Sequence, residues 1–160
     1  MTRVFKLFAL PLAIGFCLSV SLPSYAADGA VRDKLLAAIF DEDVPKVRAI
    51  LSKKGVDVKK IQGRWGGNLL LDAAESANYP IGKMLIDRGL SVHTKDPWGN
   101  TPLILAVQQA EKPEDYKLVK LLLEKGSDIN HANEKGLTAI DVAIRYDQTE
   151  CLRLLKAYKR

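Results

Sequence analysis

Apolar residues recur along this chain at helical spacing, in stripes that come in pairs. The second stripe of each pair is rich in leucine and isoleucine and includes "KMLI", "LVKLLL" and "CLRLL". Apolar residues three and four positions apart form one face of an α-helix, so each stripe predicts an amphipathic helix. The pattern therefore predicts an all-α protein built from pairs of helices.

The helix pairs repeat along the sequence. A segment that begins at Arg64 returns at Pro97, thirty-three residues later, and a shorter copy begins at Glu134. A degenerate first copy reads "LLAAIFDEDVPKVRAILSKKGVDVKK". Periods of this length are typical of stacked units, none of which can bury its apolar face without neighbours. We predict four repeats, over about residues 30–62, 63–95, 96–132 and 133–160.

Residues with special backbone preferences mark the expected helix ends. Thr101 can accept a hydrogen bond at a helix N-terminus, and Thr138 begins the equivalent helix in the last copy. Each second helix is expected to begin near a proline and to end at a glycine, because proline is tolerated in the first turn and glycine adopts a left-handed C-cap. These residues are Pro45, Pro80 and Pro113, and Gly55, Gly89 and Gly126.

Three further features concern the last two copies. In the last copy, Asp147 and Glu150 are spaced as a capping box at the start of the second helix. Pairs of small residues in the first helices, of which Ala143 and Ile144 form the last after Ala73-Ala74 and Ala106-Val107, are expected to let neighbouring helices approach closely. The third copy carries about four extra residues around "AEKPEDY", which predicts a longer loop between its helices.

These repeats resemble the ankyrin repeat family. "GNTPLILAV" and "LVKLLLEKGSDIN" are close to the family patterns G-x-T-P-L-H-x-A-A and V-x-x-L-L-x-x-G-A-D-x-N. The resemblance implies a solenoid of about four helix-turn-helix repeats with short β-turn fingers. The family's histidine is replaced by Leu71, Ile104 and Asp141, so the hydrogen bond that it makes across the turn is absent.

The first twenty-six residues have the pattern of a secretory signal peptide. Arg3 and Lys6 precede an apolar run, and Ser24 and Ala26 occupy the positions expected before a cleavage site. We expect residues 1–26 to be removed and 27–160 to remain as one ankyrin domain, without a stable membrane span, in the periplasm of a bacterium or secreted. Retention of the segment as an N-terminal anchor is the alternative.

Charge and candidate chemistry favour a binding protein over an enzyme. Removing residues 1–26 lowers the net charge from +5 to +3, and the basic residues form no concentrated patch, so no nucleic-acid partner is expected. His93 and His131 are the only histidines and are expected to be solvated turn residues, since a metal site needs more ligands. Cys151 falls in an apolar stripe and is expected to be buried. We predict no catalytic site, no metal and no cofactor.

The resemblance also implies where a partner would bind. In the family, contacts come from residues around the turn glycine and from the pair that follows the small residues of the first helix. Carried over to this sequence, these positions are Arg64, Trp65, Glu75, Ser76, Trp98, Asn100, Gln108, Gln109, Lys135, Arg145 and Tyr146.

Both tryptophans occupy the same repeat position, directly before the turn glycine. Large aromatic side chains are preferred anchors of protein interfaces, so Trp65 and Trp98 predict a contact patch on neighbouring fingers. The alternative is that each ring lies flat on its own turn and shields the next repeat.

We therefore expect a protein-binding module that is a monomer when free. Small periplasmic ankyrin proteins resemble immunity proteins that block envelope-targeted toxins such as secreted phospholipases. Our first prediction is that this protein is such an immunity protein. Others of similar build are associated with catalases and peroxide resistance. A third alternative is a scaffold that joins envelope proteins weakly.

Overall fold

The computed structural model describes residues 25–158, which form helix pairs and no strand. The elements are α1 (Tyr25–Phe40), α2 (Val44–Leu51), the 3-10 helix η1 (Val58–Lys60), α3 (Leu69–Glu75), α4 (Tyr79–Asp87), α5 (Pro102–Gln109), α6 (Tyr116–Glu124), α7 (Ala139–Arg145) and α8 (Thr149–Tyr158). This architecture confirms the predicted all-α solenoid of helix-turn-helix repeats.

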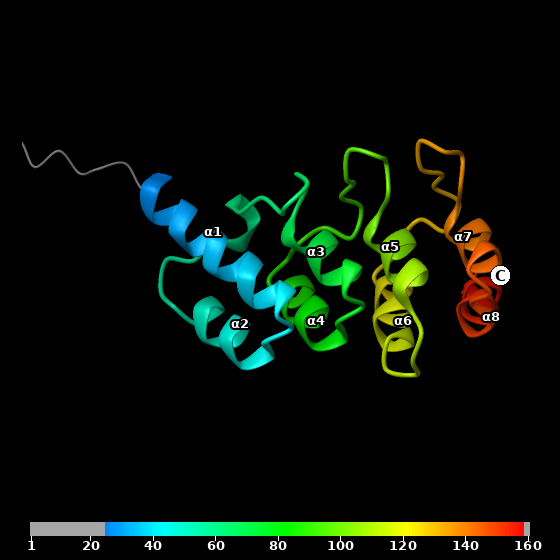
Figure 1. The fold of residues 1–160 in the computed structure, drawn as a ribbon, viewed down its shortest axis with the longest axis horizontal. Coiled ribbons are helices and arrows are strands. Elements are labelled where there is room, and N and C mark those ends of the chain that lie inside the picture. Colours follow the sequence, from blue (N-terminus) through cyan, green and yellow to red (C-terminus); the bar gives the residue numbers. More distant parts are fainter. Residues whose placement is uncertain (1–24, 159–160) are drawn as a thin grey trace, which may run out of the picture.

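The helices form two rows that run along the stack (Figure 1). The first helices contact their neighbours in the order α1, α3, α5 and α7, and the second helices in the order α2, α4, α6 and α8. One apolar cluster runs through the stack from Leu35 in α1 to Leu155 in α8, and both side chains are fully buried. Each repeat therefore buries its apolar face against the next repeat.

Side-chain caps begin the helices at the predicted places. The Thr101 hydroxyl accepts the backbone N–H of Ile104 at 3.4 Å. Thr138 and Asp141 form a capping box, in which each side chain accepts the other residue's backbone N–H. Asp141, which replaces the family histidine, thus binds locally within its own helix.

Two of the three predicted glycine C-caps have the expected geometry. Gly89 and Gly126 follow α4 and α6 with φ of 82° and 83°. In each case the next residue's N–H reaches back to a helix carbonyl, at 3.2 Å from Leu90 to Leu85. Gly55 is also left-handed, with φ of 90°, but α2 ends at Leu51, so this glycine turns the connection that follows the helix.

The structure corrects two local expectations in the last repeat. Asp147 is left-handed, with φ of 59°, and lies before the start of α8, while Glu150 pairs with Arg153 at 2.6 Å. These two residues therefore form no capping box. Ile144 is 60% exposed, so only Ala143 of its pair lies between helices.

The loop of the third repeat is longer than its counterparts, as predicted. Residues 110–115 join α5 to α6, whereas residues 76–78 join α3 to α4. In the shorter loops the chain turns through a left-handed residue, Glu42, Ala77 or Asp147. The extra residues of the third repeat thus replace a tight turn by a wider one.

The predicted signal peptide lies almost entirely outside the described residues, which begin at Tyr25 with α1. Its cleavage after Ala26 stays a prediction. Among residues 25–158, the helices lack the length and hydrophobicity that a transmembrane segment requires.

Candidate protein-binding surface

The fingers are the turns that precede α3, α5 and α7. In the two that begin at Asp96 and Asn133, the side chain of the first residue holds the turn by hydrogen bonds. Asp96 accepts the backbone N–H groups of Trp98 and Asn100 at 2.9 and 2.8 Å. Asn133 accepts those of Lys135 and Leu137 in the next finger, both at 3.0 Å. The tips are therefore fixed by hydrogen bonds even though the family's histidine is absent.

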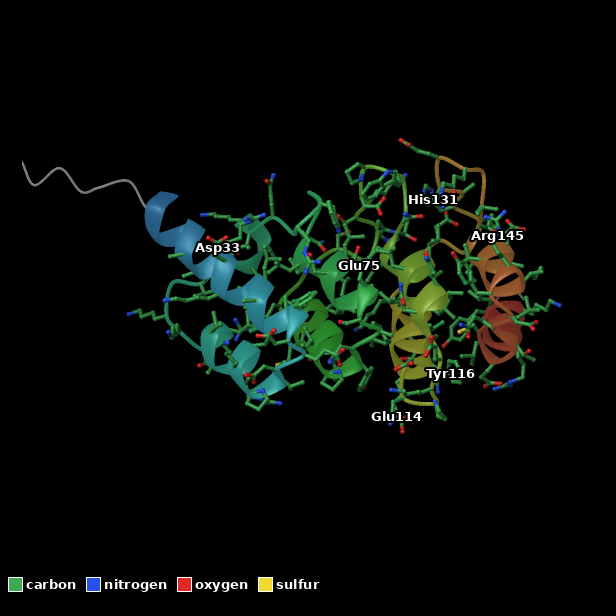
Figure 2. All side chains as sticks on the ribbon, in the orientation of Figure 1. Asp33, Glu75, Glu114, Tyr116, His131 and Arg145 are labelled. Atoms are coloured by element: carbon green, nitrogen blue, oxygen red, sulfur yellow. The ribbon has the colours of Figure 1, made fainter. Side chains whose placement is uncertain are left out.

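Neighbouring fingers are also bound to each other. The N–H of Glu134 donates to the Trp98 carbonyl at 3.0 Å, and the Asn133 amide donates to Asn100 at 2.7 Å. Nε2 of His131 lies 2.8 Å from the Gly99 carbonyl. His131, labelled beside the fingers in Figure 2, is thus a partly buried link between turns and not the solvated residue that we predicted.

The finger before α3 lacks such a side chain, because its first residue is Gly63. Asp72, from inside α3, supplies the missing carboxylate and accepts the Arg64 N–H at 3.1 Å. A Cβ atom on Gly63 would collide with this carboxylate. Burial raises the pKa of Asp72 above its ordinary value, partly opposed by the hydrogen bond from Arg64.

The two tryptophans contact each other at the finger tips. Their ring centroids are 5.6 Å apart and their planes meet at 67°, an edge-to-face arrangement. Trp65 and Trp98 are 45% and 48% exposed. Near Trp65, the pKa of Glu75 is raised by burial and by the nearby Asp72 carboxylate. The rings therefore brace each other and still present an aromatic surface.

Six of the predicted site residues line one groove of about 430 Å³ between the last two fingers. We call it the finger groove, and its predicted lining residues are Trp98, Asn100, Gln108, Lys135, Arg145 and Tyr146. Asn133, Glu134, Leu137 and Val142 complete it. The Gln108 amide donates to the Tyr146 hydroxyl at 3.3 Å, which joins α5 to the end of α7.

Three other predicted residues lie elsewhere on the stack. Glu75, Ser76 and Gln109 line a hollow of about 290 Å³ together with Glu42, Glu111, Lys112 and Asp115, which we call the acidic hollow. Arg64 and Trp65 line neither depression. The predicted set is therefore divided between a groove, a hollow and a finger tip.

Phe40 is an exposed aromatic residue that the repeat pattern did not point to. Its side chain is 69% exposed at the end of α1, and the Arg64 guanidinium lies 5.1 Å from the ring centroid. Phe40 stands two residues before left-handed Glu42, as Glu75 stands before Ala77. Aligning the degenerate first copy on its interhelix turn would have found this position.

Other chemistry is limited in the described part of the chain. No group of three metal-ligating side chains is found among residues 25–158. Cys151 is buried, as predicted, and burial raises its thiol pKa to about 11. A thiol of this kind is protonated near neutral pH and is a poor nucleophile.

Comparison with known proteins agrees with the repeat architecture. The family described as ankyrin repeats in three copies matches residues 35–133 and 70–160. An ankyrin repeat protein of fowlpox virus is 37% identical over 136 residues, which cover 76% of this chain and 26% of the relative. One of Rickettsia bellii is 28% identical over 118 residues, covering 73% of this chain and 63% of the relative. The chain thus spans only a part of these relatives, and it belongs to the ankyrin repeat family.

Proposed function

We propose that this protein is an exported, non-catalytic binding module of the bacterial periplasm. It would hold one folded partner protein on the fingers and the finger groove. Ankyrin repeats generally mediate protein–protein interaction, and proteins built from them are typically non-catalytic. The observation that carries the proposal is the half-exposed, edge-to-face pair of Trp65 and Trp98 beside the groove.

The rigidity of the fingers supports a tight interaction. Ordering a loop on binding costs free energy, and the hydrogen bonds of Asp96 and Asn133 have already ordered these tips. Aromatic side chains with few rotamers lose little entropy when they are covered. A slow off-rate with one partner is the behaviour required of an immunity protein that inhibits an envelope-targeted toxin, which is the partner class we propose.

In the first test, the protein is purified in the form that the cell produces and is used to capture partners from envelope extract. The Trp65→Ala, Trp98→Ala double variant is compared with Tyr158→Ala, which removes an exposed aromatic side chain in α8. We expect one partner to be captured by the wild type and by the control but lost from the double variant. The single variant Trp98→Ala, at a residue that lines the finger groove, replaces the double variant if that variant no longer melts cooperatively.

Purified components then decide the partner class. A toxin partner should bind one to one, and its enzymatic activity should be blocked in the complex. A haem enzyme with unchanged activity would instead favour the catalase-associated alternative, and several weak partners would favour a scaffold. Export is checked on the same preparation, because periplasmic protein cleaved as proposed begins at Ala27. Equal capture by the double variant and the wild type would refute the proposed site.

A further inference from the structure

The finger groove contains two cations whose side chains have no hydrogen bond or ion pair with another of residues 25–158. Lys135 lines it from the last finger. Arg145, labelled in Figure 2, lines it from the end of α7. Among residues 25–158, the ion pairs of the structure involve other side chains. Both residues are exposed, so their charges are available to a bound molecule.

Most neutral polar groups of the groove are already engaged. Asn100 and Asn133 hold the finger turns through both ends of their amides. The Gln108 amide binds Tyr146. Three charged groups remain for a ligand, and two of them are positive, the third being Glu134. The groove therefore offers an excess of cationic donors.

The remaining walls are apolar or aromatic. Trp98, Leu137, Val142 and Tyr146 line the groove beside the cations, and Trp98 and Tyr146 are each about half exposed. A guanidinium binds a carboxylate through two parallel hydrogen bonds, and aromatic walls cover an apolar neighbour. This combination fits a carboxylate carried next to an apolar side chain.

We propose that the finger groove binds an acidic side chain on an exposed loop of the partner protein. The aspartate or glutamate carboxylate meets Arg145 and Lys135, and an adjoining apolar residue packs on Trp98, Leu137 and Tyr146. This inference rests on the proposed function, because it assumes a protein partner, and it adds the chemistry of the segment that is recognised.

The charge pattern along the first helices favours the finger groove over the acidic hollow as the site of that segment. Phe40, Glu75 and Arg145 each stand two residues before a left-handed turn residue, so this repeat position changes from apolar to acidic to basic along the stack. Figure 2 shows Glu75 on α3 and Arg145 on α7, with α5 between them. The acidic hollow near Glu75 carries four carboxylates and one cation, Lys112. It therefore repels an acidic loop that is displaced from the finger groove toward the N-terminal end of the stack.

The test uses two blocked tripeptide amides, Leu-Glu-Leu and Leu-Gln-Leu, titrated into the isotope-labelled full gene product and followed by NMR. We expect Leu-Glu-Leu to shift the amide signals of Lys135, Leu137 and Tyr146, with affinity in the millimolar range for so small a ligand. Leu-Gln-Leu should bind about tenfold more weakly, since a neutral amide loses the charge-assisted hydrogen bonds.

Two variants separate the groove charge from the overall charge of the protein. The Arg145→Gln variant should bind Leu-Glu-Leu about tenfold more weakly than the wild type and should bind Leu-Gln-Leu with unchanged affinity. Arg88→Gln removes an exposed arginine at the C-terminal end of α4, outside the groove, and should change neither affinity. Neither substitution removes an observed hydrogen bond of the side chain, so both variants should fold.

Three results would overturn the inference. Equal binding of Leu-Glu-Leu and Leu-Gln-Leu shows that charge is not recognised, and shifts confined to the acidic hollow show that the groove is not the site. Inorganic phosphate binding the same residues as tightly as Leu-Glu-Leu shows a general anion site. If the captured partner still needs the tryptophans but binds Arg145→Gln as tightly as wild type, the proposed function stands and this inference fails.

Discussion

A single missing side chain reorganises the finger before α3. Asp96 and Asn133 begin their fingers and bind the turn themselves, whereas Gly63 begins the equivalent finger and cannot. Asp72 fills this place from within α3, at the cost of burying a carboxylate that is only 5% exposed. The consequence is an acid whose pKa is raised in the folded protein.

The raised pKa of Asp72 gives a pH-dependent contribution to stability. Between its ordinary value of 3.8 and its higher folded value, the native state binds more protons at this site than the unfolded chain. This contribution therefore falls as pH rises through that window. Asp72→Asn keeps an acceptor for Arg64 but does not titrate, so its stability relative to wild type should increase from pH 4 upward. Urea unfolding at pH 4 to 7 measures the difference, and a decrease with pH would contradict the assignment.

At the scale of elements, the stack depends on close approach between second helices. Gly82 lies in α4 at the point where α6 packs against it, and both Gly82 and Leu118 are buried. A Cβ atom at Gly82 would lie 2.6 Å from Cδ1 of Leu118. Helix propensity alone would favour alanine at this position, so glycine is explained by the contact between helices.

We predict that Gly82→Ala destabilises the protein by about 1–3 kcal/mol, because overpacking outweighs the gain in helix propensity. Chemical denaturation measures the change. In a Leu118→Ala background the clash is relieved, and the same substitution should become neutral or stabilising by about 1 kcal/mol. An equal loss in both backgrounds would show that the contact with Leu118 is not the cause.

The whole molecule is a linear stack, so its repeats differ in how many neighbours support them. Among residues 25–158, the last pair, α7 and α8, packs on one side only, against α5 and α6, whereas α3 and α4 contact repeats on both sides. Stability in such arrays is a sum of repeat terms and interface terms. A destabilising substitution in the last repeat should therefore weaken only that repeat. One in a middle repeat should also weaken the repeats on both sides of it.

Leu155→Ala and Leu85→Ala test this expectation with the same chemical change. Both leucines are fully buried, in α8 and α4, and each truncation should cost about 2–5 kcal/mol at its site. By hydrogen exchange, Leu155→Ala should lower protection in α7 and α8 and leave α3 and α4 protected. Leu85→Ala should lower protection throughout residues 30–158. Uniform loss in both variants would instead indicate a single cooperative unit.

The sequence by itself determined the repeat period, the two rows of helices and most helix ends, including the Thr101 and Thr138 caps and the Gly89 and Gly126 turns. These features follow from interactions between residues that are close in sequence. Such interactions can be predicted from residue types and their spacing. The two exposed tryptophans were predicted in the same way, from their repeat position.

Only the tertiary structure decided which side chains from different repeats meet. It placed the Trp65 ring against Trp98, the Arg64 guanidinium over Phe40 and His131 on the Gly99 carbonyl. It also divided the predicted contact residues between the finger groove and the acidic hollow. These contacts join residues of neighbouring repeats, and their geometry depends on how far each repeat is rotated and shifted against the next. That packing is a property of the whole stack, which no local pattern of residues encodes.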